Sequence, residues 1–307
     1  MTADGDSRAS GEYVPRRPWR DEVVPIRGLD THLTWWGERN DNPVVLLHGF
    51  MDAGRTWQFL VDCLPQSWTC VAPDWRGFGE SARSQGPYWF ADYFADLEAL
   101  LDVLNPRAAL RVIAHSMGGN IASMYAGVRP QRLAWLADLE GIGLPRNVGE
   151  LAVQRYARWL DQLREPRKER HYESIEQLAS ILAGRNTRLG LARARFIARA
   201  WTRRVAQGYE LASDPFHGLV NPTLYRREDA ESCWREVAAP VLMLFGEQSE
   251  FRDRLGADGS DSRLHAMFRD LRIATVAAVG HMMQHEDPGA VAEHIVRFAD
   301  HCGRDIT

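Results

Sequence analysis

Six short apolar runs constrain the fold of this chain more than any other feature of its sequence. They are PVVLL (43–47), CVAP (70–73), ALRVIA (109–114), LAWLADL (133–139), PVLMLF (240–245) and RIATVAAV (272–279). An unbroken apolar run of about four to eight residues is typical of a strand that is buried on both faces, as strands of parallel sheets are. The runs therefore predict a mostly parallel central sheet.

Helical patterns lie between these runs. Residues 90–104 carry an apolar stripe at helical spacing, residues 117–128 follow the third run, and Asp287-Pro288 is typical of the start of a helix over 288–300. Residues 22–36 alternate apolar and polar side chains around a central turn, which indicates a hairpin. Strands that alternate with helices predict an α/β fold with a doubly wound sheet and right-handed crossovers.

The alternation stops between residues 146 and 235. This stretch has no clear strand and several helical segments, one of which begins with the capping-box pattern Ser174-Ile175-Glu176-Gln177. We interpret 146–235 as a helical cap inserted into a core formed by 21–145 and 236–307. Residues 1–20 are rich in Gly, Ser, Pro and charged side chains, which predicts a disordered N-terminal tail.

The net charge and its distribution along the chain bear on the kind of partner. The 307 residues carry a net charge of -4, which does not favour nucleic acid as a partner. Residues 146–204 hold 14 Lys and Arg against 6 Asp and Glu. This excess could attract an anionic substrate, but a solvated helical surface is the preferred interpretation, since Arg is a good helix former.

The sequence also predicts where the protein works. No apolar run approaches the ~18 residues of a membrane helix, and the N-terminus lacks the apolar stretch of a secretory signal. The four cysteines show no spacing typical of metal ligands, and we interpret them as reduced thiols: Cys63, Cys70, Cys233 and Cys302. We therefore expect a cytoplasmic protein without a membrane span.

The segment Ala114-His115-Ser116-Met117-Gly118 follows a predicted strand and precedes a predicted helix. A nucleophilic serine stands exposed at such a sharp turn when small residues lie two positions before and after it. Ala114 and Gly118 are those small residues, although glycine is more usual at the first position. Ser116 is therefore the candidate nucleophile, preferred over a serine that only caps the helix.

Two backbone amides are candidates for an oxyanion hole. In folds with this serine turn, one donor follows the nucleophile and the other comes from the loop after an earlier strand. That loop reads Leu47-His48-Gly49-Phe50, so we assign the N–H groups of Phe50 and Met117. His48 is interpreted as a structural residue of the loop.

The candidate base is His281, in the segment Gly280-His281-Met282 after the last predicted strand. A histidine near the end of the chain fits the order serine, acid, histidine. His285 is the rival candidate, but it lies close to the following helix.

Four stretches give this chain a family resemblance over about residues 22–300: LLHGF, APDWRGFGES, AHSMGGNIASMYAGVRP and GHMMQHEDP. In order and spacing they resemble the α/β-hydrolase superfamily, in a form with a serine nucleophile and a helical cap. The resemblance implies an α/β-hydrolase fold and a cap over 146–235 that controls access of substrate. It says little about which substrate is bound.

The acid departs from the common pattern of that family. Many members carry an aspartate in the loop that here reads Gly246-Glu247-Gln248-Ser249-Glu250, and Ser249 occupies its position. One group of haloalkane dehalogenases places the acid after the preceding strand, where this chain has Glu140. By that similarity Glu140 is the preferred acid, with Glu250 second and Glu247 third. Asp138 is assigned to the strand itself.

These residues predict acyl transfer on a small, apolar acyl substrate, without metal or cofactor. Esterase is the main hypothesis, and thioesterase, amidase and carbon–carbon bond hydrolase stay open. A cofactor-free haloperoxidase-like activity would use the same groups. A protein that only binds, on a hydrolase scaffold, is the alternative to an enzyme, and only the serine at 249 favours it.

Epoxide hydrolases and haloalkane dehalogenases use an aspartate as nucleophile. Ser116 at that position therefore argues against both of these activities. The sequence indicates no oligomeric state.

Overall fold

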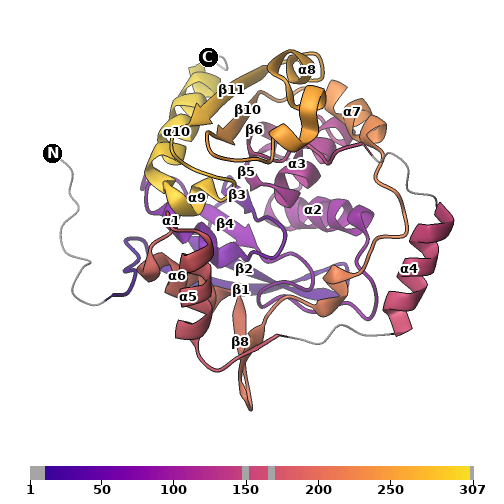
Figure 1. Cartoon of the computed structure of the whole chain (residues 1–307). Coiled ribbons are helices and arrows are strands. Elements are labelled where there is room, and N and C mark those ends of the chain that lie inside the picture. Colours follow the sequence, from indigo (N-terminus) through magenta and orange to yellow (C-terminus); the bar gives the residue numbers. More distant parts are fainter. Residues whose placement is uncertain (1–10, 147–151, 165–169, 305–307) are drawn as a thin grey trace.

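The central feature of the structure is an eight-stranded sheet with the order β1-β2-β4-β3-β5-β6-β10-β11 (Figure 1). The structure is a computed structural model, and it describes residues 11–146, 152–164 and 170–304. The strands are β1 Trp19–Ile26, β2 Leu29–Trp36, β3 Val44–Leu47, β4 Cys70–Pro73, β5 Leu110–His115, β6 Leu133–Leu139, β10 Val241–Gly246 and β11 Leu271–Val276. β1 and β2 form the predicted hairpin, and all strands from β4 to β11 in this order pair in parallel. The predicted α/β fold is confirmed.

Helices cover both faces of this sheet. They are α1 Gln58–Val61, α2 Phe90–Leu104, α3 Met117–Val128, α7 Arg227–Arg235, α8 Asp261–His265, α9 Met283–Glu286 and α10 Pro288–Arg304. α2, α3, α7 and α8 bury apolar side chains against one face, while α1, α9 and α10 cover the other. Each fully buried Leu or Val side chain contributes about 1.5–3 kcal/mol, so the two layers hold the sheet rigid.

The segment between β6 and β10 contains a second, small sheet. It comprises α4 Ala152–Arg164, β7 His171–Tyr172, α5 Ile175–Arg185, α6 Leu191–Ala200, β8 Thr202–Val205, β9 Gly208–Leu211 and the 3-10 helix η2 Pro215–Gly218. β7, β9 and β8 pair in antiparallel fashion, so the prediction of a stretch without strands was wrong. These strands have only two to four residues, too few for the alternation of polar and apolar side chains to stand out.

The start of α5 and the position of α7 can be compared with the predictions for this segment. The Ser174 hydroxyl accepts a hydrogen bond of 3.2 Å from the Gln177 amide, as the capping pattern predicts. α7 packs on α3, where Trp234 donates a hydrogen bond to Ser123 and joins the main apolar core. The predicted cap at 146–235 therefore includes a helix that lies against the core.

The described part of the predicted N-terminal tail is held in place. Tyr13 donates a hydrogen bond of 2.6 Å to Asp62, and its ring lies edge-on to Phe59. The backbone amides of Arg16 and Arg17 donate to the same Asp62 carboxylate, and β1 already begins at Trp19. The prediction of disorder was wrong for residues 11–20, because one buried carboxylate collects three donors from the segment.

The carboxyl ends of the parallel strands meet at one edge of the sheet. Ser116 follows β5, Glu140 follows β6, and residues 247–251 follow β10. In open α/β sheets this edge is where sites form. In Figure 1 the edge faces the small helices α5 and α6 of the inserted segment.

Candidate active site

Ser116 lies in a strained turn between β5 and α3. Its backbone has φ 52° and ψ −113°, a conformation that side chains other than glycine rarely adopt. The predicted glycine is required two residues later, because a Cβ on Gly118 would lie 2.4 Å from the Leu47 carbonyl oxygen. The turn is therefore pressed against the end of β3, and this contact presents the serine hydroxyl above the edge of the sheet.

The imidazole of His281 lies between Ser116 and a carboxylate. Its Nε2 is 3.0 Å from Ser116 Oγ, and its Nδ1 is 2.6 Å from Glu140 Oε2. The Glu140 side chain is fully buried, whereas the His281 side chain is 33% exposed. With the proton on Nδ1 shared with Glu140, Nε2 is free to accept the serine proton.

The other predicted acids do not contact this histidine. Glu250 is exposed and pairs with Arg254 at 3.2 Å, while Glu247 accepts a hydrogen bond of 2.8 Å from the Ala278 amide. Asp138 is buried in β6, two residues before Glu140, and its Oδ1 accepts from the Gly141 amide. Among the acids weighed from the sequence, the structure brings only Glu140 to His281.

Glu140 is held at both carboxylate oxygens. The Gly246 amide donates to Oε1 at 2.8 Å, and the Ser249 hydroxyl donates to Oε2 at 2.8 Å. The residue itself has φ 57°, so its backbone is also fixed in an uncommon conformation. The sequence analysis considered Ser249 only as a replacement for the usual aspartate, yet its hydroxyl holds the Glu140 carboxylate. The position of Ser249 in the loop that usually carries the acid was the feature that could have indicated this role.

Phe251 is a second residue that the sequence analysis missed. Its ring stacks on His281, with centroids 4.9 Å apart and an angle of 22° between the planes. The Phe251 amide also donates to Ser249 Oγ at 3.2 Å. The loop after β10 thus contacts both the acid and the base, although nothing in the spacing of its residues indicates this.

The predicted oxyanion donors lie beside the serine. Met117 is the first residue of α3, and a Cβ on Gly49, which precedes Phe50, would lie 3.2 Å from Ser116 Cβ. Within the described part of the chain, no protein acceptor takes a hydrogen bond from the amide of Phe50 or of Met117. Both N–H groups are therefore available to a ligand at Ser116.

The remaining histidines near the site have structural contacts. His48 accepts a hydrogen bond from the Trp75 amide at 3.0 Å, and burial lowers its pKa, which supports the structural role predicted for it. His285 is also buried with a lowered pKa, and its Nε2 faces Asp52 at 3.5 Å. It lies in α9, and no hydrogen bond joins it to Ser116 in the described residues.

His115, directly before the nucleophile, ties two loops of the site together. Its Nε2 donates to the His281 carbonyl at 2.9 Å. Burial holds the pKa of His115 well below its usual range, so the ring stays neutral and keeps this hydrogen bond. A Cβ on Gly49 would lie 2.7 Å from its Nδ1, which explains the glycine before Phe50.

The described ranges lack two further features, a metal site and a membrane-spanning helix. No group of three or more His, Cys, Asp or Glu side chains there is arranged to hold a metal ion. In the same ranges, no helix is both long and apolar enough to cross a membrane.

Known proteins resemble this chain in sequence and in fold. Residues 42–288 match the family described as alpha/beta hydrolase fold. A serine hydrolase-like protein of Danio rerio is 28% identical over 95% of this chain and 89% of its own. A haloalkane dehalogenase of Mesorhizobium japonicum is 29% identical over 53% of this chain and 48% of its own. Among solved structures, the thioesterase domain from the curacin biosynthetic pathway superposes with a TM-score of 0.78 at 21% identity, covering 91% of this chain and 99% of that domain.

Proposed function

Since this chain belongs to the alpha/beta hydrolase family, we propose that it is a serine hydrolase that cleaves an ester or a related acyl bond. The observation that carries the proposal is the line of hydrogen bonds from Ser116 through His281 to Glu140. A serine, an imidazole and a buried carboxylate in this order are the parts of a nucleophilic acyl-transfer site.

In the first half of the reaction, Ser116 Oγ attacks the carbonyl carbon while His281 Nε2 takes the hydroxyl proton. The amides of Phe50 and Met117 donate hydrogen bonds to the oxyanion that forms on the carbonyl oxygen. The partial positive charge at the start of α3 adds to this stabilisation. The tetrahedral adduct then expels the leaving group, which takes the proton from His281, and an acyl ester remains on Ser116.

In the second half, water replaces the leaving group. His281 takes a proton from water, the resulting hydroxide attacks the acyl ester, and the carboxylic acid leaves as Ser116 regains its proton. Glu140 accepts the Nδ1 hydrogen bond throughout, which fixes the tautomer and stabilises the imidazolium. No step needs a metal ion or an organic cofactor.

The nucleophile argues against the reaction of the dehalogenase relative. An aspartate that displaces a halide forms an alkyl ester, which water can hydrolyse. Ser116 would form an alkyl ether instead, which the same site could not cleave. We therefore assign acyl substrates rather than alkyl halides to this chain, with residues 146–226 as the cap over the site and α7 as part of the core.

The loop after β10 weakens the case for a protein that only binds. That hypothesis depended on the serine at 249, since it replaces the usual aspartate. Ser249 donates to Glu140, so the site retains an acid and a group that holds it. Haloperoxidase-like and carbon–carbon bond hydrolase activities would use the same three residues, and no contact of the described residues favours either over ester hydrolysis.

The test combines a fluorophosphonate probe with 4-nitrophenyl esters of increasing chain length. We expect stoichiometric labelling and turnover in the wild type, and neither in Ser116→Ala. Ser232→Ala, which changes an exposed serine on α7, is the matched control and keeps both. Hydrolysis that survives in Ser116→Ala would refute the assignment, and folded wild type that takes no label would favour a binding function.

A further inference from the structure

A cavity of about 250 Å³ opens beside the turn that carries the proposed oxyanion donor. Met51, which directly follows Phe50, lies in its wall. α5 forms another wall and ends next to Asn186, which donates a hydrogen bond of 2.8 Å to Glu286. Glu286 in turn accepts from the amide of Gly280, the neighbour of His281. Met51 therefore places one wall next to the proposed oxyanion donor, and two hydrogen bonds connect the end of α5 to the loop that carries His281.

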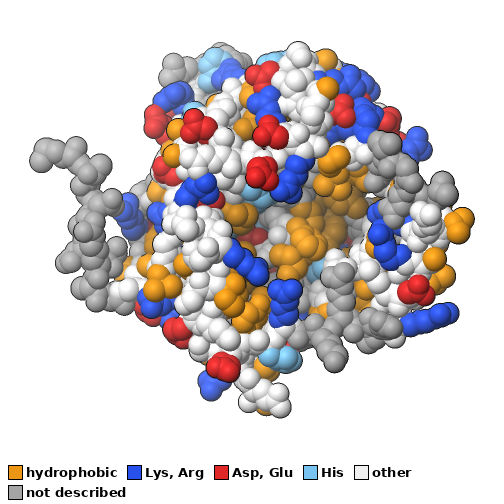
Figure 2. Space-filling model, in the orientation of Figure 1, with side chains coloured by type: hydrophobic (Ala, Val, Ile, Leu, Met, Phe, Trp, Pro, Cys, Tyr) orange, Lys and Arg blue, Asp and Glu red, His pale blue; other side chains and the backbone are white. Residues whose placement is uncertain are grey.

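The lining of this cavity is apolar, with a cationic border. Its apolar side chains are Met51, Ala53, Leu178, Leu182, Trp201, Leu211 and Ala212. Arg170 and Arg185 also line it, and both are exposed. Figure 2 shows hydrophobic side chains gathered in the hollow between α5 and α4, with Lys and Arg side chains at its border.

The two arginines have no counter-charge in the part of the chain that the structure describes. No ion pair or hydrogen bond joins Arg170 or Arg185 to a described carboxylate. The one acid in the lining is Asp52, which is buried and occupied. Its Oδ1 accepts from Thr56 and from the Trp201 indole at 2.8 Å or less. With Asp52 counted, the lining carries a net charge of +1, and its two arginines form no ion pair with a described carboxylate.

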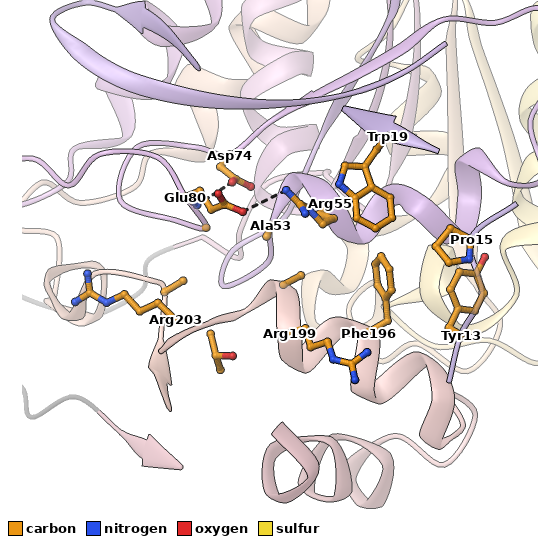
Figure 3. A pocket seen from close by; sticks show the side chains of 14 residues that line it. Tyr13, Pro15, Trp19, Ala53, Arg55, Asp74, Glu80, Phe196, Arg199 and Arg203 are labelled. Atoms are coloured by element: carbon orange, nitrogen blue, oxygen red, sulfur yellow. Dashed lines mark hydrogen bonds and ion pairs between the residues drawn. The ribbon is translucent and has the colours of Figure 1, made fainter. Parts of the chain in front are cut away.

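A neighbouring cavity shows the opposite arrangement. It has a volume of about 370 Å³ and lies beyond Ala53, Gly79 and Ala212, which line both cavities. Figure 3 shows its arginines, of which Arg55 pairs with Glu80. Arg199 pairs with Glu12, and Arg203 with Glu210. The two arginines of the inserted segment that line this second cavity are therefore paired, whereas Arg170 and Arg185 form no ion pair with a described carboxylate.

We propose that the cavity at Met51 binds an anionic group of the substrate, a carboxylate or a phosphate, through Arg170 and Arg185. This inference rests on the proposed function, because it names the substrate class of the same site. A guanidinium pairs with two oxygens of such a group at once, and the apolar lining gives room for the carbon chain that carries the group. The substrate is thus an acyl ester or thioester that carries negative charge on the part lying in this cavity.

The test compares charged and neutral substrates of equal length. 4-Nitrophenyl hydrogen adipate carries a free carboxylate, which methyl 4-nitrophenyl adipate masks. A short acyl-CoA thioester carries phosphate on the leaving thiol. We expect Arg170→Gln/Arg185→Gln to lower kcat/KM roughly tenfold or more for a charged substrate, since a hydrogen bond to a charged group contributes about 1.5–3 kcal/mol. The neutral diester should change less than about twofold.

Arg199→Gln in the neighbouring cavity is the matched control. It should leave the ratio of kcat/KM for charged and neutral substrates unchanged. A selective loss on the adipate identifies a carboxylate, and a selective loss on the thioester identifies a phosphate. An unchanged ratio of charged to neutral substrate in the double variant, for both charged substrates, would overturn the inference. Failure of the proposed function looks different, since the neutral diester would then not turn over and the probe would not label Ser116.

Discussion

The hydroxyl of Ser249 donates a hydrogen bond of 2.8 Å to Glu140 Oε2, the oxygen that also accepts from His281 Nδ1. Two donors therefore share one carboxylate oxygen, while the Gly246 amide holds the other. Ser249, at the position where the sequence analysis expected an aspartate, thus contacts the carboxylate that we propose as the acid. This arrangement gives Ser249 a positioning role that a substitution can measure.

Ser249→Ala should lower kcat roughly threefold to tenfold with little change in KM, since a hydrogen bond to a charged group is lost. Without this donor the Glu140 carboxylate accepts one hydrogen bond fewer, and the His281 ring that it orients is less well fixed for proton transfer. Ser249→Thr keeps the hydroxyl and should restore the wild-type kcat. An unchanged kcat in Ser249→Ala, or a loss confined to KM, would contradict the role.

Glu140→Gln should reduce kcat by about 10³- to 10⁴-fold, because the amide no longer stabilises the imidazolium or selects its tautomer. Glu250→Gln is the matched control. Its side chain is 81% exposed and contacts Arg254, so activity should stay within about twofold of wild type. Steady-state kinetics on one 4-nitrophenyl ester measures the activity of both variants. A large loss of activity in Glu250→Gln would instead assign the role of the acid to Glu250.

Gly118→Ala should destabilise the protein by roughly 1–3 kcal/mol or more, because its Cβ would meet the Leu47 and His48 carbonyl oxygens at 2.4 and 2.7 Å. Gly184→Ala in α5 places its methyl in open space and should stabilise by up to about 1 kcal/mol. Thermal unfolding of the two variants gives the comparison. Equal melting temperatures would show that the turn at Ser116 has more room than the structure indicates.

Asp138 should make stability depend on pH. Burial raises its pKa from 3.8 to about 7, with the charge of Glu140 adding to the shift. The folded protein then holds a proton that the unfolded chain releases, so between these values stability falls by about 1.4 kcal/mol per pH unit as pH rises.

Urea unfolding at pH 5 and pH 8 tests this dependence. Asp138→Asn should lose less stability between the two pH values than wild type, because the amide keeps an oxygen for the Gly141 amide and does not ionise. Asp161→Asn, at a side chain that is 76% exposed, should behave as wild type. The same pH dependence in Asp138→Asn and wild type would assign it to other groups.

Regular patterns in the sequence predicted the core well. The apolar runs became β3 to β11 of the large sheet, and the stripe at 90–104 became α2 within the same bounds. Both patterns reflect local periodicity, which burial on a defined face imposes residue by residue. The short strands of the inserted segment and the anchoring of Tyr13 were missed, because their contacts join residues far apart in the chain.

By itself the sequence predicted the sharp turn at Ser116, the histidine after the last strand and the loop beside Phe50, since each is a local motif with a fixed place in a parallel sheet. It left three acids open, because Glu140, Glu247 and Glu250 all follow strand ends at the same edge. Only the tertiary structure shows which of the three carboxylates contacts His281, and it is that of Glu140. The register of β6 against β10 brings the Glu140 carboxylate under the Gly246 amide and the Ser249 hydroxyl, and the side chains of Glu247 and Glu250 point elsewhere.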